Sequence, residues 1–242
     1  MSEVACSSAV VAVDSQNSST SEKRFSCLML RVFKAVYLNL GKIKESVVLT
    51  TSSLSNIEKD LLGASLKDLS KEESGSLKRV VGLFANDGIE RGEGSPTQLA
   101  MTSAAIELLL SRTSNCSGFF LMSEGSQIDW AGHDNDAKKM IEEFRDFDAT
   151  IKEIIKFINK NKNTLLIVTA DHETGGLQIL KRSKNSIKVQ WSTGSHTAAP
   201  VGVFSYGPGA EIFEGTMDNT DIHNKILNLL SFNDLEDNSC KY

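Results

Sequence analysis

Three of the four histidines in this chain lie in short motifs that are rich in acids, glycines and hydroxyl side chains. The motifs are Glu124-Gly-Ser-Gln-Ile-Asp129-Trp-Ala-Gly-His133, Asp171-His172-Glu-Thr-Gly-Gly and Thr193-Gly-Ser-His196-Thr. Carboxylate oxygens and imidazole nitrogens together suit zinc or a similar divalent cation. The four cysteines are far apart in the sequence and follow no metal-ligand spacing. The histidine motifs therefore predict a metal site.

The spacing within the motifs indicates more than one metal ion. Asp129 and His133 are four residues apart, so their side chains meet on one side of a helical turn or tight loop. Asp171 and His172 are consecutive, and such side chains do not easily reach one ion, although they can reach toward two. A pair of ions roughly 4 Å apart suits phosphoryl transfer, because one can activate the attacking oxygen while the other stabilises the leaving oxygen. We expect at least two metals, with His196 joining from a third loop.

Other polar residues near these motifs have simpler explanations. His223 lies in the first turns of an amphipathic helix, where a surface or capping role is expected. Glu173 precedes Thr-Gly-Gly and is expected to be structural, because paired glycines mark turns. Loop hydrogen bonding is expected for Ser123, Ser126 and Ser195, and solvated positions for Arg145 and Arg182.

Alternating strands and helices are expected to position the metal ligands. Short apolar runs predict strands at residues 47–51, 80–85, 119–122, 165–169, 177–180, 186–191 and 201–206. Capping residues and helical spacing predict helices at residues 53–64, 95–112, 140–158 and 218–230. This alternation is typical of the α/β class with a mostly parallel sheet, in which ligands bind beyond the carboxyl ends of strands. Two of the motifs directly follow predicted strands and are expected at one crevice.

Two of these helices carry particular signals. Ser95 and Pro96 predict a capped start for the helix at residues 95–112. The helix at residues 140–158 has apolar residues at steps of four and three, which predicts one apolar face. The residues of this face are Met140, Phe144, Phe147, Ile151, Ile154 and Ile158.

Composition limits the class of protein and its partners. The 242 residues suffice for one domain with a sizeable core, and the net charge of −5 argues against a nucleic-acid partner. No apolar stretch reaches the roughly 20 residues that span a bilayer, and the first residues lack the positive region of an export signal. The serine-rich segment 1–24 is expected to be poorly structured, and residues 25–242 to form the α/β domain.

Three long motifs resemble the C-terminal half of alkaline phosphatases. They span residues 118–136, 164–176 and 192–197, and the segments 80–85 and 217–221 are also similar to family segments. The resemblance implies a three-layer α/β sandwich with a mostly parallel sheet, here truncated. It also implies metal-dependent hydrolysis of phosphomonoesters through a phosphoserine intermediate. Members of this family are usually periplasmic or extracellular, and a homodimer is the candidate assembly.

The resemblance implies a role for each candidate ligand. Asp129, His133 and His196 would hold one zinc ion, Asp171 and His172 would contribute to a second zinc site, and Glu124 would contribute to a magnesium site. Most of the N-terminal half that carries the nucleophile in this family is expected to be missing. The segment Val13-Asp-Ser15-Gln-Asn-Ser-Ser-Thr20 is similar to the family's nucleophile motif and makes Ser15 the candidate nucleophile.

Two alternative functions remain open at this point. The first is a non-catalytic metal-binding fragment or pseudoenzyme that keeps a zinc site without turnover. The second is another metalloenzyme of the wider superfamily, such as a cofactor-independent phosphoglycerate mutase or a sulfatase, because these enzymes use comparable acids and histidines. The length of the matching motifs favours the alkaline phosphatase type over the second alternative.

Overall fold

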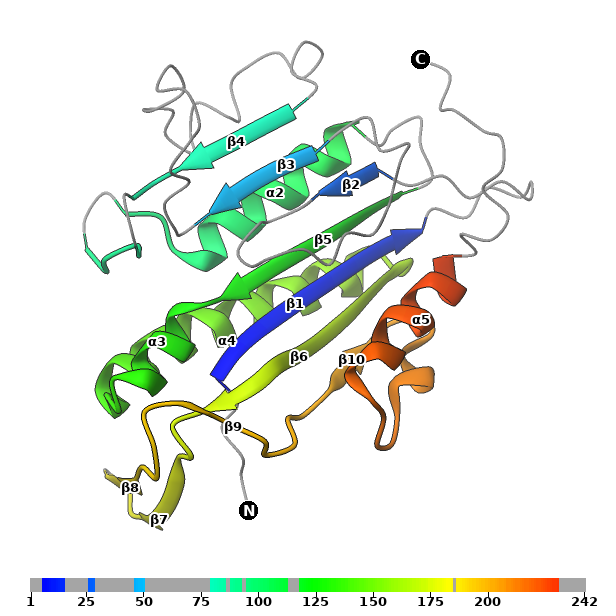
Figure 1. Cartoon of the computed structure of the whole chain (residues 1–242). Coiled ribbons are helices and arrows are strands. Elements are labelled where there is room, and N and C mark those ends of the chain that lie inside the picture. Colours follow the sequence, from blue (N-terminus) through cyan, green and yellow to red (C-terminus); the bar gives the residue numbers. More distant parts are fainter. Residues whose placement is uncertain are drawn as a thin grey trace.

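The computed structural model describes residues 6–15, 26–28, 46–50, 79–85, 88–92, 95–112, 118–184 and 186–230. A mixed sheet forms the centre of this part of the chain, with strand order β10-β6-β1-β5-β2 (Figure 1). Its strands are β1 (Cys6–Ser15), β2 (Ser26–Leu28), β5 (Gly118–Gly125), β6 (Thr164–Thr174) and β10 (Phe204–Tyr206). The helix expected at residues 53–64 lies outside the described residues.

The sheet combines both strand directions. Strands β5 and β6 are each antiparallel to β1, so they run parallel to one another, and β2 is parallel to β5. Strand β10 is antiparallel to β6 at one edge. The sheet is therefore mixed where a mostly parallel sheet was expected, because β1 and β10 run against their neighbours. The parallel pair β5 and β6 still directs both carboxyl ends to the same edge.

Strand β1 differs from the sequence prediction. Residues 1–24 were expected to be poorly structured, and this prediction is wrong for Cys6–Ser15, which pairs with β5 on one side and β6 on the other. The segment contains three valines, which favour extended backbone. The apolar run is short and flanked by serines, so the sequence pattern for a strand is weak. The strands that pair with it on both sides are more than a hundred residues away.

Smaller pairs of strands lie beside this sheet. Strands β3 (Ser46–Thr50) and β4 (Arg79–Leu83) form a parallel pair, and β7 (Gln178–Arg182) and β8 (Ile187–Gln190) form an antiparallel hairpin. The two-residue strand β9 (His196–Thr197) pairs with the end of β6. These elements agree with the strands predicted near residues 47–51, 80–85, 177–180 and 186–191.

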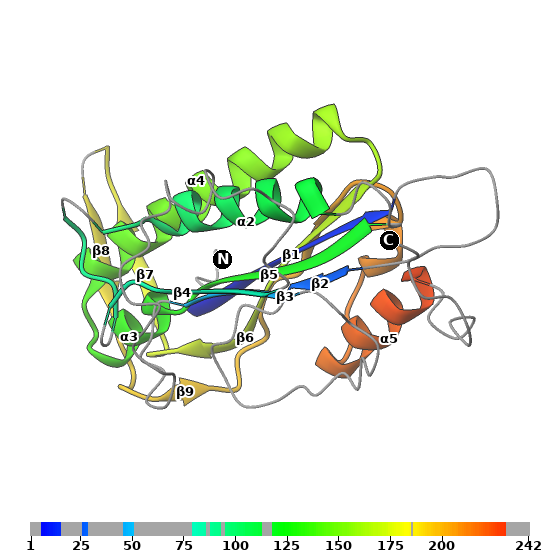
Figure 2. The same cartoon turned by 90° about the horizontal axis from the view of Figure 1, so that it is seen from above.

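Helices cover both faces of the sheet and make three layers (Figure 2). Helices α2 (Gln98–Arg112) and α4 (Ala137–Lys160) lie on one face, and α5 (Asn219–Leu230) lies on the other with the short helix η2 (Ala210–Phe213). Each face has its own apolar cluster. The cluster under α5 contains Leu165 and Ile167 of β6 and Phe213, all buried. No helix among the described residues is both long enough and apolar enough to cross a membrane.

Helix α4 confirms its predicted extent but not its whole predicted face. Asp136 caps it by accepting hydrogen bonds from the backbone of Lys138 and Lys139, each at 3.0 Å. Met140, Phe147, Ile154 and Ile158 are buried as expected. Phe144 belongs to the predicted apolar face but is 43 % exposed. Periodicity identifies the apolar face, whereas the neighbouring elements decide how much of that face they cover.

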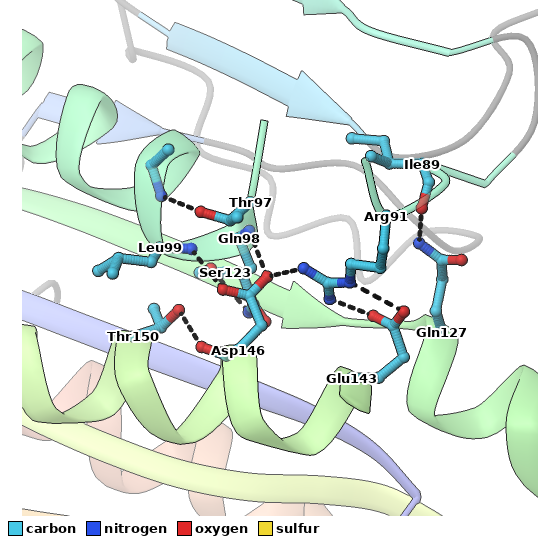
Figure 3. Close-up of polar contacts among 11 residues, drawn as sticks. Ile89, Arg91, Thr97, Gln98, Leu99, Ser123, Gln127, Glu143, Asp146 and Thr150 are labelled. Atoms are coloured by element: carbon cyan, nitrogen blue, oxygen red, sulfur yellow. Dashed lines mark hydrogen bonds and ion pairs between the residues drawn. The ribbon is translucent and has the colours of Figure 1, made fainter. Parts of the chain in front are cut away.

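Helix α2 begins three residues later than its first predicted capping signal. The hydroxyl of Thr97, not of Ser95, accepts a hydrogen bond from the backbone N–H of Ala100 at 3.0 Å. The carboxylate of Asp146 on α4 accepts two more, from the backbone of Gln98 at 2.7 Å and Leu99 at 3.4 Å (Figure 3). A negative charge at a helix N-terminus is stabilising, so Asp146 attaches α2 to α4.

Candidate metal centre

The carboxyl end of β5 leads directly into the helix that carries two predicted ligands. Glu124 is still part of β5, and helix α3 (Gln127–His133) starts after Ser126. Asp129 lies in the first turn of this helix and is buried, whereas His133 lies in its last turn and is exposed. The four-residue spacing places both side chains on one face of the helix, as predicted.

Asp129, His133 and His196 converge on one point. The Nε2 atom of His133 lies 3.5 Å from one carboxylate oxygen of Asp129, and Nε2 of His196 lies 3.6 Å from the other. The two Nε2 atoms are 3.0 Å apart. Each of the three residues offers one ligand atom, and these atoms all lie within 4.8 Å of one another. The structure therefore brings together the three residues predicted for the first zinc site.

These distances fit a small divalent cation. Two ligands of a tetrahedral zinc ion, each about 2.1 Å from the metal, lie about 3.4 Å apart. Each imidazole lies within a few tenths of an ångström of that distance from one carboxylate oxygen of Asp129, His133 from Oδ2 and His196 from Oδ1. One carboxylate and two imidazoles are also a donor set that zinc uses in catalytic sites. The residues present fit a zinc ion with a further position open.

A backbone carbonyl orients the ring of His133. Its Nδ1 atom lies 2.8 Å from the carbonyl oxygen of Gly194. A carbonyl can only accept, so the proton of a neutral His133 is at Nδ1 and the lone pair is at Nε2, which faces Asp129 and His196. The segment before His196 thus positions a ligand on α3 as well as supplying one.

Glu173 holds together strands β6 and β9, which carry His172 and His196. Its buried carboxylate accepts hydrogen bonds from the backbone of Gly176 at 3.1 Å and Leu177 at 3.2 Å, and from the hydroxyl of Thr197. In the ladder between β6 and β9, Glu173 is opposite Thr197 and Thr174 is opposite His196. The structural role predicted for Glu173 is confirmed, and its effect is to fix His196 beside β6.

A glycine allows the chain to leave β6 at the edge of this cluster. Gly175 has a φ of +90°, and a Cβ atom there would lie 2.5 Å from the ring of Trp191 and 3.0 Å from the carbonyl oxygen of Gly132. Its backbone N–H donates to the carbonyl of Ser195 at 3.0 Å. The close approach of the segment before His196 to α3 therefore requires glycine at this position.

Asp171 and His172 also lie within reach of one another. Nε2 of His172 is 3.4 Å from Oδ2 of Asp171. Oδ1 of Asp171 accepts a hydrogen bond from the backbone N–H of His172 at 3.1 Å, which turns the carboxylate back along the strand. The ring of His172 stacks on that of His196, with the centroids 3.6 Å apart. The pair therefore lies directly beside the first cluster.

Glu124 has a different set of neighbours. It lines a small pocket together with Arg91, Gln98, Glu143 and Asp146, and it is not a member of the three-residue ligand group. Arg91 pairs there with Glu143 through two nitrogen–oxygen contacts and with Asp146 (Figure 3). Burial alone would lower the pKa of Arg91, but its hydrogen bonds and charge contacts with the two carboxylates raise that pKa on balance.

Ser15 lies away from the metal cluster. Along β1, Ser15 pairs with Gly118 at the start of β5, whereas Ser8 pairs with Gly125 at the end that leads to α3. Seven residues of extended strand separate those two positions, which is roughly 23 Å. The antiparallel direction of β1 therefore places Ser15 at the opposite edge of the sheet from this cluster.

Sequence reasoning missed two groups of the site. The carbonyl of Gly194 orients His133, and the hydroxyl of Thr174 contacts both Asp129 and His172. A backbone carbonyl leaves no trace in side-chain motifs. Thr174 could have been identified from the period of two along a strand, since it lies two residues after His172 and so on the same face.

Comparison with known proteins agrees with this geometry. The family model described as alkaline phosphatase matches residues 62–186, which is about half of the chain. The chain belongs to the alkaline phosphatase family. It is 31 % identical to alkaline phosphatase 3 of Bacillus subtilis, an alignment that covers 69 % of this chain and 51 % of that protein. Alkaline phosphatase 4 of the same organism is 32 % identical over 63 % of this chain and 48 % of its own length. The chain thus spans about half the length of these curated relatives.

Solved alkaline phosphatase structures share the fold. The enzyme from the Antarctic bacterium TAB5 has a TM-score of 0.60 and 35 % identity, over 76 % of this chain and 52 % of that one. A variant of the TAB5 enzyme was solved with Mg bound. The cold-active enzyme from Shewanella has a TM-score of 0.65 at 24 % identity, over 77 % of this chain and 66 % of that one, which supports the fold alone. The predicted alkaline phosphatase-like α/β fold is confirmed.

Proposed function

We propose that this chain binds zinc and takes part in phosphomonoester hydrolysis of the alkaline phosphatase type, with small phosphomonoesters as substrates. The convergence of Asp129, His133 and His196 on one point carries this proposal. Bound divalent cations would supply Lewis-acid stabilisation of the charge on the phosphoryl oxygens. Asp171 and His172 would contribute to a second zinc site, because their ligand atoms are 3.4 Å apart beside the first cluster.

The chain's own residues would prepare this site in two ways. The carbonyl of Gly194 holds His133 with its Nε2 lone pair toward the ion, and Glu173 fixes the strand that carries His196. Glu124 would contribute to a magnesium site, as the family resemblance implies. Glu143 and Asp146 line the same pocket as Glu124, and Arg91 pairs with both of these carboxylates there.

A second candidate function follows from the position of Ser15. The candidate nucleophile lies at the opposite edge of the sheet from the candidate ligands. A chain that binds zinc but does not hydrolyse phosphomonoesters is consistent with this arrangement. Ser15 as the phosphorylated residue remains a hypothesis that a Ser15→Ala variant tests directly.

One experiment separates these two functions. The chain is expressed with zinc and magnesium, its bound metal is measured by atomic emission, and its hydrolysis of a chromogenic phosphomonoester is followed at alkaline pH. Stoichiometric zinc with hydrolysis supports the enzyme, and loss of that hydrolysis in Ser15→Ala would assign the nucleophile. Stoichiometric zinc without hydrolysis supports the metal-binding function, and absence of zinc binding contradicts both.

We also propose a homodimer as the assembly, following the family resemblance. Light scattering distinguishes a dimer from a monomer of 26.4 kDa. A mass equal to that of the single chain at micromolar concentration would contradict the dimer.

A further inference from the structure

The hydroxyl of Thr174 connects the two groups of candidate ligands. Thr174 is fully buried at the end of β6, directly opposite His196 in the ladder with β9. Its Oγ1 donates to Oδ1 of Asp129 at 2.5 Å and lies 3.2 Å from Nδ1 of His172. Asp129 belongs to the first cluster and His172 to the second pair. A single side chain therefore contacts one ligand from each group.

The single proton of the Thr174 hydroxyl determines which atom donates in its hydrogen bonds with Asp129 and His172. A threonine hydroxyl has one proton, and an ionised carboxylate can only accept, so that proton lies toward Asp129. The oxygen of Thr174 can then only accept from His172, which requires the proton of a neutral His172 to be at Nδ1. The lone pair of His172 is consequently at Nε2, the atom that lies 3.4 Å from Oδ2 of Asp171.

We propose that Thr174 is a positioning residue that couples the two metal sites, an inference that rests on the proposed zinc-binding function. Its hydroxyl orients the carboxylate of Asp129 for the first ion and holds the ring of His172 in the tautomer that presents Nε2 to the second. An ion at either site fixes one of these partners, and the shared hydrogen bond then orients the other. Zinc at one site therefore raises the affinity of the other, and the effect is reciprocal.

The location of Thr174 explains why one hydroxyl can serve both groups. His172 and Thr174 are two residues apart on a strand, so they lie on the same face of β6. Helix α3 brings Asp129 against that face from a position 45 residues earlier. The buried hydroxyl is shielded from water, which strengthens its hydrogen bonds compared with exposed ones.

The test replaces the hydroxyl and keeps the shape. Thr174→Val is expected to weaken zinc binding about 10- to 100-fold, as loss of a residue that orients a ligand usually does. It is also expected to abolish the positive coupling between the two sites in a zinc titration. Thr174→Ser retains the hydroxyl and is expected to restore both properties.

Thr150 offers a matched control. It is fully buried on α4, and its hydroxyl donates to the carbonyl oxygen of Asp146 at 2.8 Å, away from the metal ligands. Thr150→Val removes an equally buried hydroxyl and is expected to leave zinc affinity and coupling unchanged. A similar loss of affinity in both valine variants would overturn the inference, because the effect would then be one of general stability.

A second measurement needs no variant to fold. Nitrogen-15 NMR of the imidazoles in the unaltered chain without metal is expected to show neutral His172 protonated at Nδ1. A proton at Nε2 would overturn the inference, as would unchanged zinc binding and coupling in Thr174→Val. Absence of zinc binding in the unaltered chain would instead contradict the proposed function, so the two failures are distinguishable.

Discussion

Buried carboxylates lie in two places near the end of β5, and they differ in the groups that compensate their charge. Glu143 and Asp146 have side chains that are 8 % and 9 % exposed, and both pair with Arg91. Asp129 is 9 % exposed as well, but it faces two imidazoles and the hydroxyl of Thr174. Equal burial thus accompanies different partners, and the partners rather than the depth distinguish Glu143 and Asp146 from the candidate metal ligand Asp129.

The comparison has a physical basis. A buried carboxylate needs a compensating charge or several hydrogen bonds. Arg91 provides the charge permanently, because a guanidinium does not lose its proton in the working range of a protein. Imidazoles that are neutral offer lone pairs instead, so the charge at Asp129 can be met by a bound cation. The carboxylates around Arg91 attach α2 to α4, whereas Asp129, His133 and His196 form the candidate metal centre.

Removing both exposed imidazoles should give the largest effect. The double variant His133→Ala with His196→Ala leaves Asp129 as the sole member of the three-residue ligand group, so it is expected to lose one bound zinc per chain. Zinc content after dialysis, measured by atomic emission, checks this. The control is His223→Ala on α5, which is expected to keep the full zinc content. A double variant with unaltered zinc content would show that the ligand assignment is wrong.

Replacing Arg91 should destabilise the fold without changing zinc binding. Arg91→Met leaves two buried carboxylates without their partner, and we expect a loss of about 2–3 kcal/mol in the free energy of unfolding. The figure is toward the low end for a broken buried pair, because Arg91 itself is 34 % exposed. Urea unfolding measures it, and zinc content is expected to remain unchanged.

Lys152 provides the matched control for Arg91. It pairs with Asp148 on the same helix, but these side chains are 68 % and 48 % exposed. Lys152→Met is therefore expected to change the free energy of unfolding by less than about 0.5 kcal/mol. Equal losses of unfolding free energy in Arg91→Met and Lys152→Met would contradict the distinction between the buried and exposed ion pairs. Loss of zinc in Arg91→Met would show that zinc binding depends on Arg91 and its carboxylates.

A third carboxylate, Asp218 before α5, should give the smallest effect. Hydrogen bonds from the backbone N–H and the hydroxyl of Thr220 lower the pKa of this exposed group. A lowered folded-state pKa means that the stabilisation is present above the unfolded pKa and is lost as pH falls through the folded value. Asp218→Asn is therefore expected to destabilise the chain slightly near pH 6, with a difference that shrinks below about pH 4. Thermal unfolding at several pH values measures this difference, and a constant difference over that range would contradict it.

The sequence predicted elements well where the pattern was local and long. Helix α4 follows from its regular apolar spacing and α5 from a similar pattern after Asp218, whose capping is a local effect. Predictions were poorer where distant partners decide. Strand β1 was missed because its pairing comes from β5 and β6, and these strands continue through Glu124 and His172, where loops were expected.

The site shows the same division. Asp129 and His133 were correctly paired because four residues separate them on a helix, which is local geometry. Ser15 was associated with the site through its motif, and the direction of β1 places it at the other edge. The convergence of Asp171 and His172 on each other was not predicted, because it depends on a carboxylate that turns back to its own backbone.

The sequence by itself determined which residue types could bind metal and which family they resemble, because motifs of acids and histidines keep their order along the chain. Only the tertiary structure decided which of them meet. His133 and His196 are 63 residues apart and come within 3.0 Å through the pairing of β6 with β9. The same fold brings Thr174 into contact with Asp129 and His172, and pairs Arg91 with two carboxylates. Long-range packing sets these distances between side chains, and no local pattern encodes it.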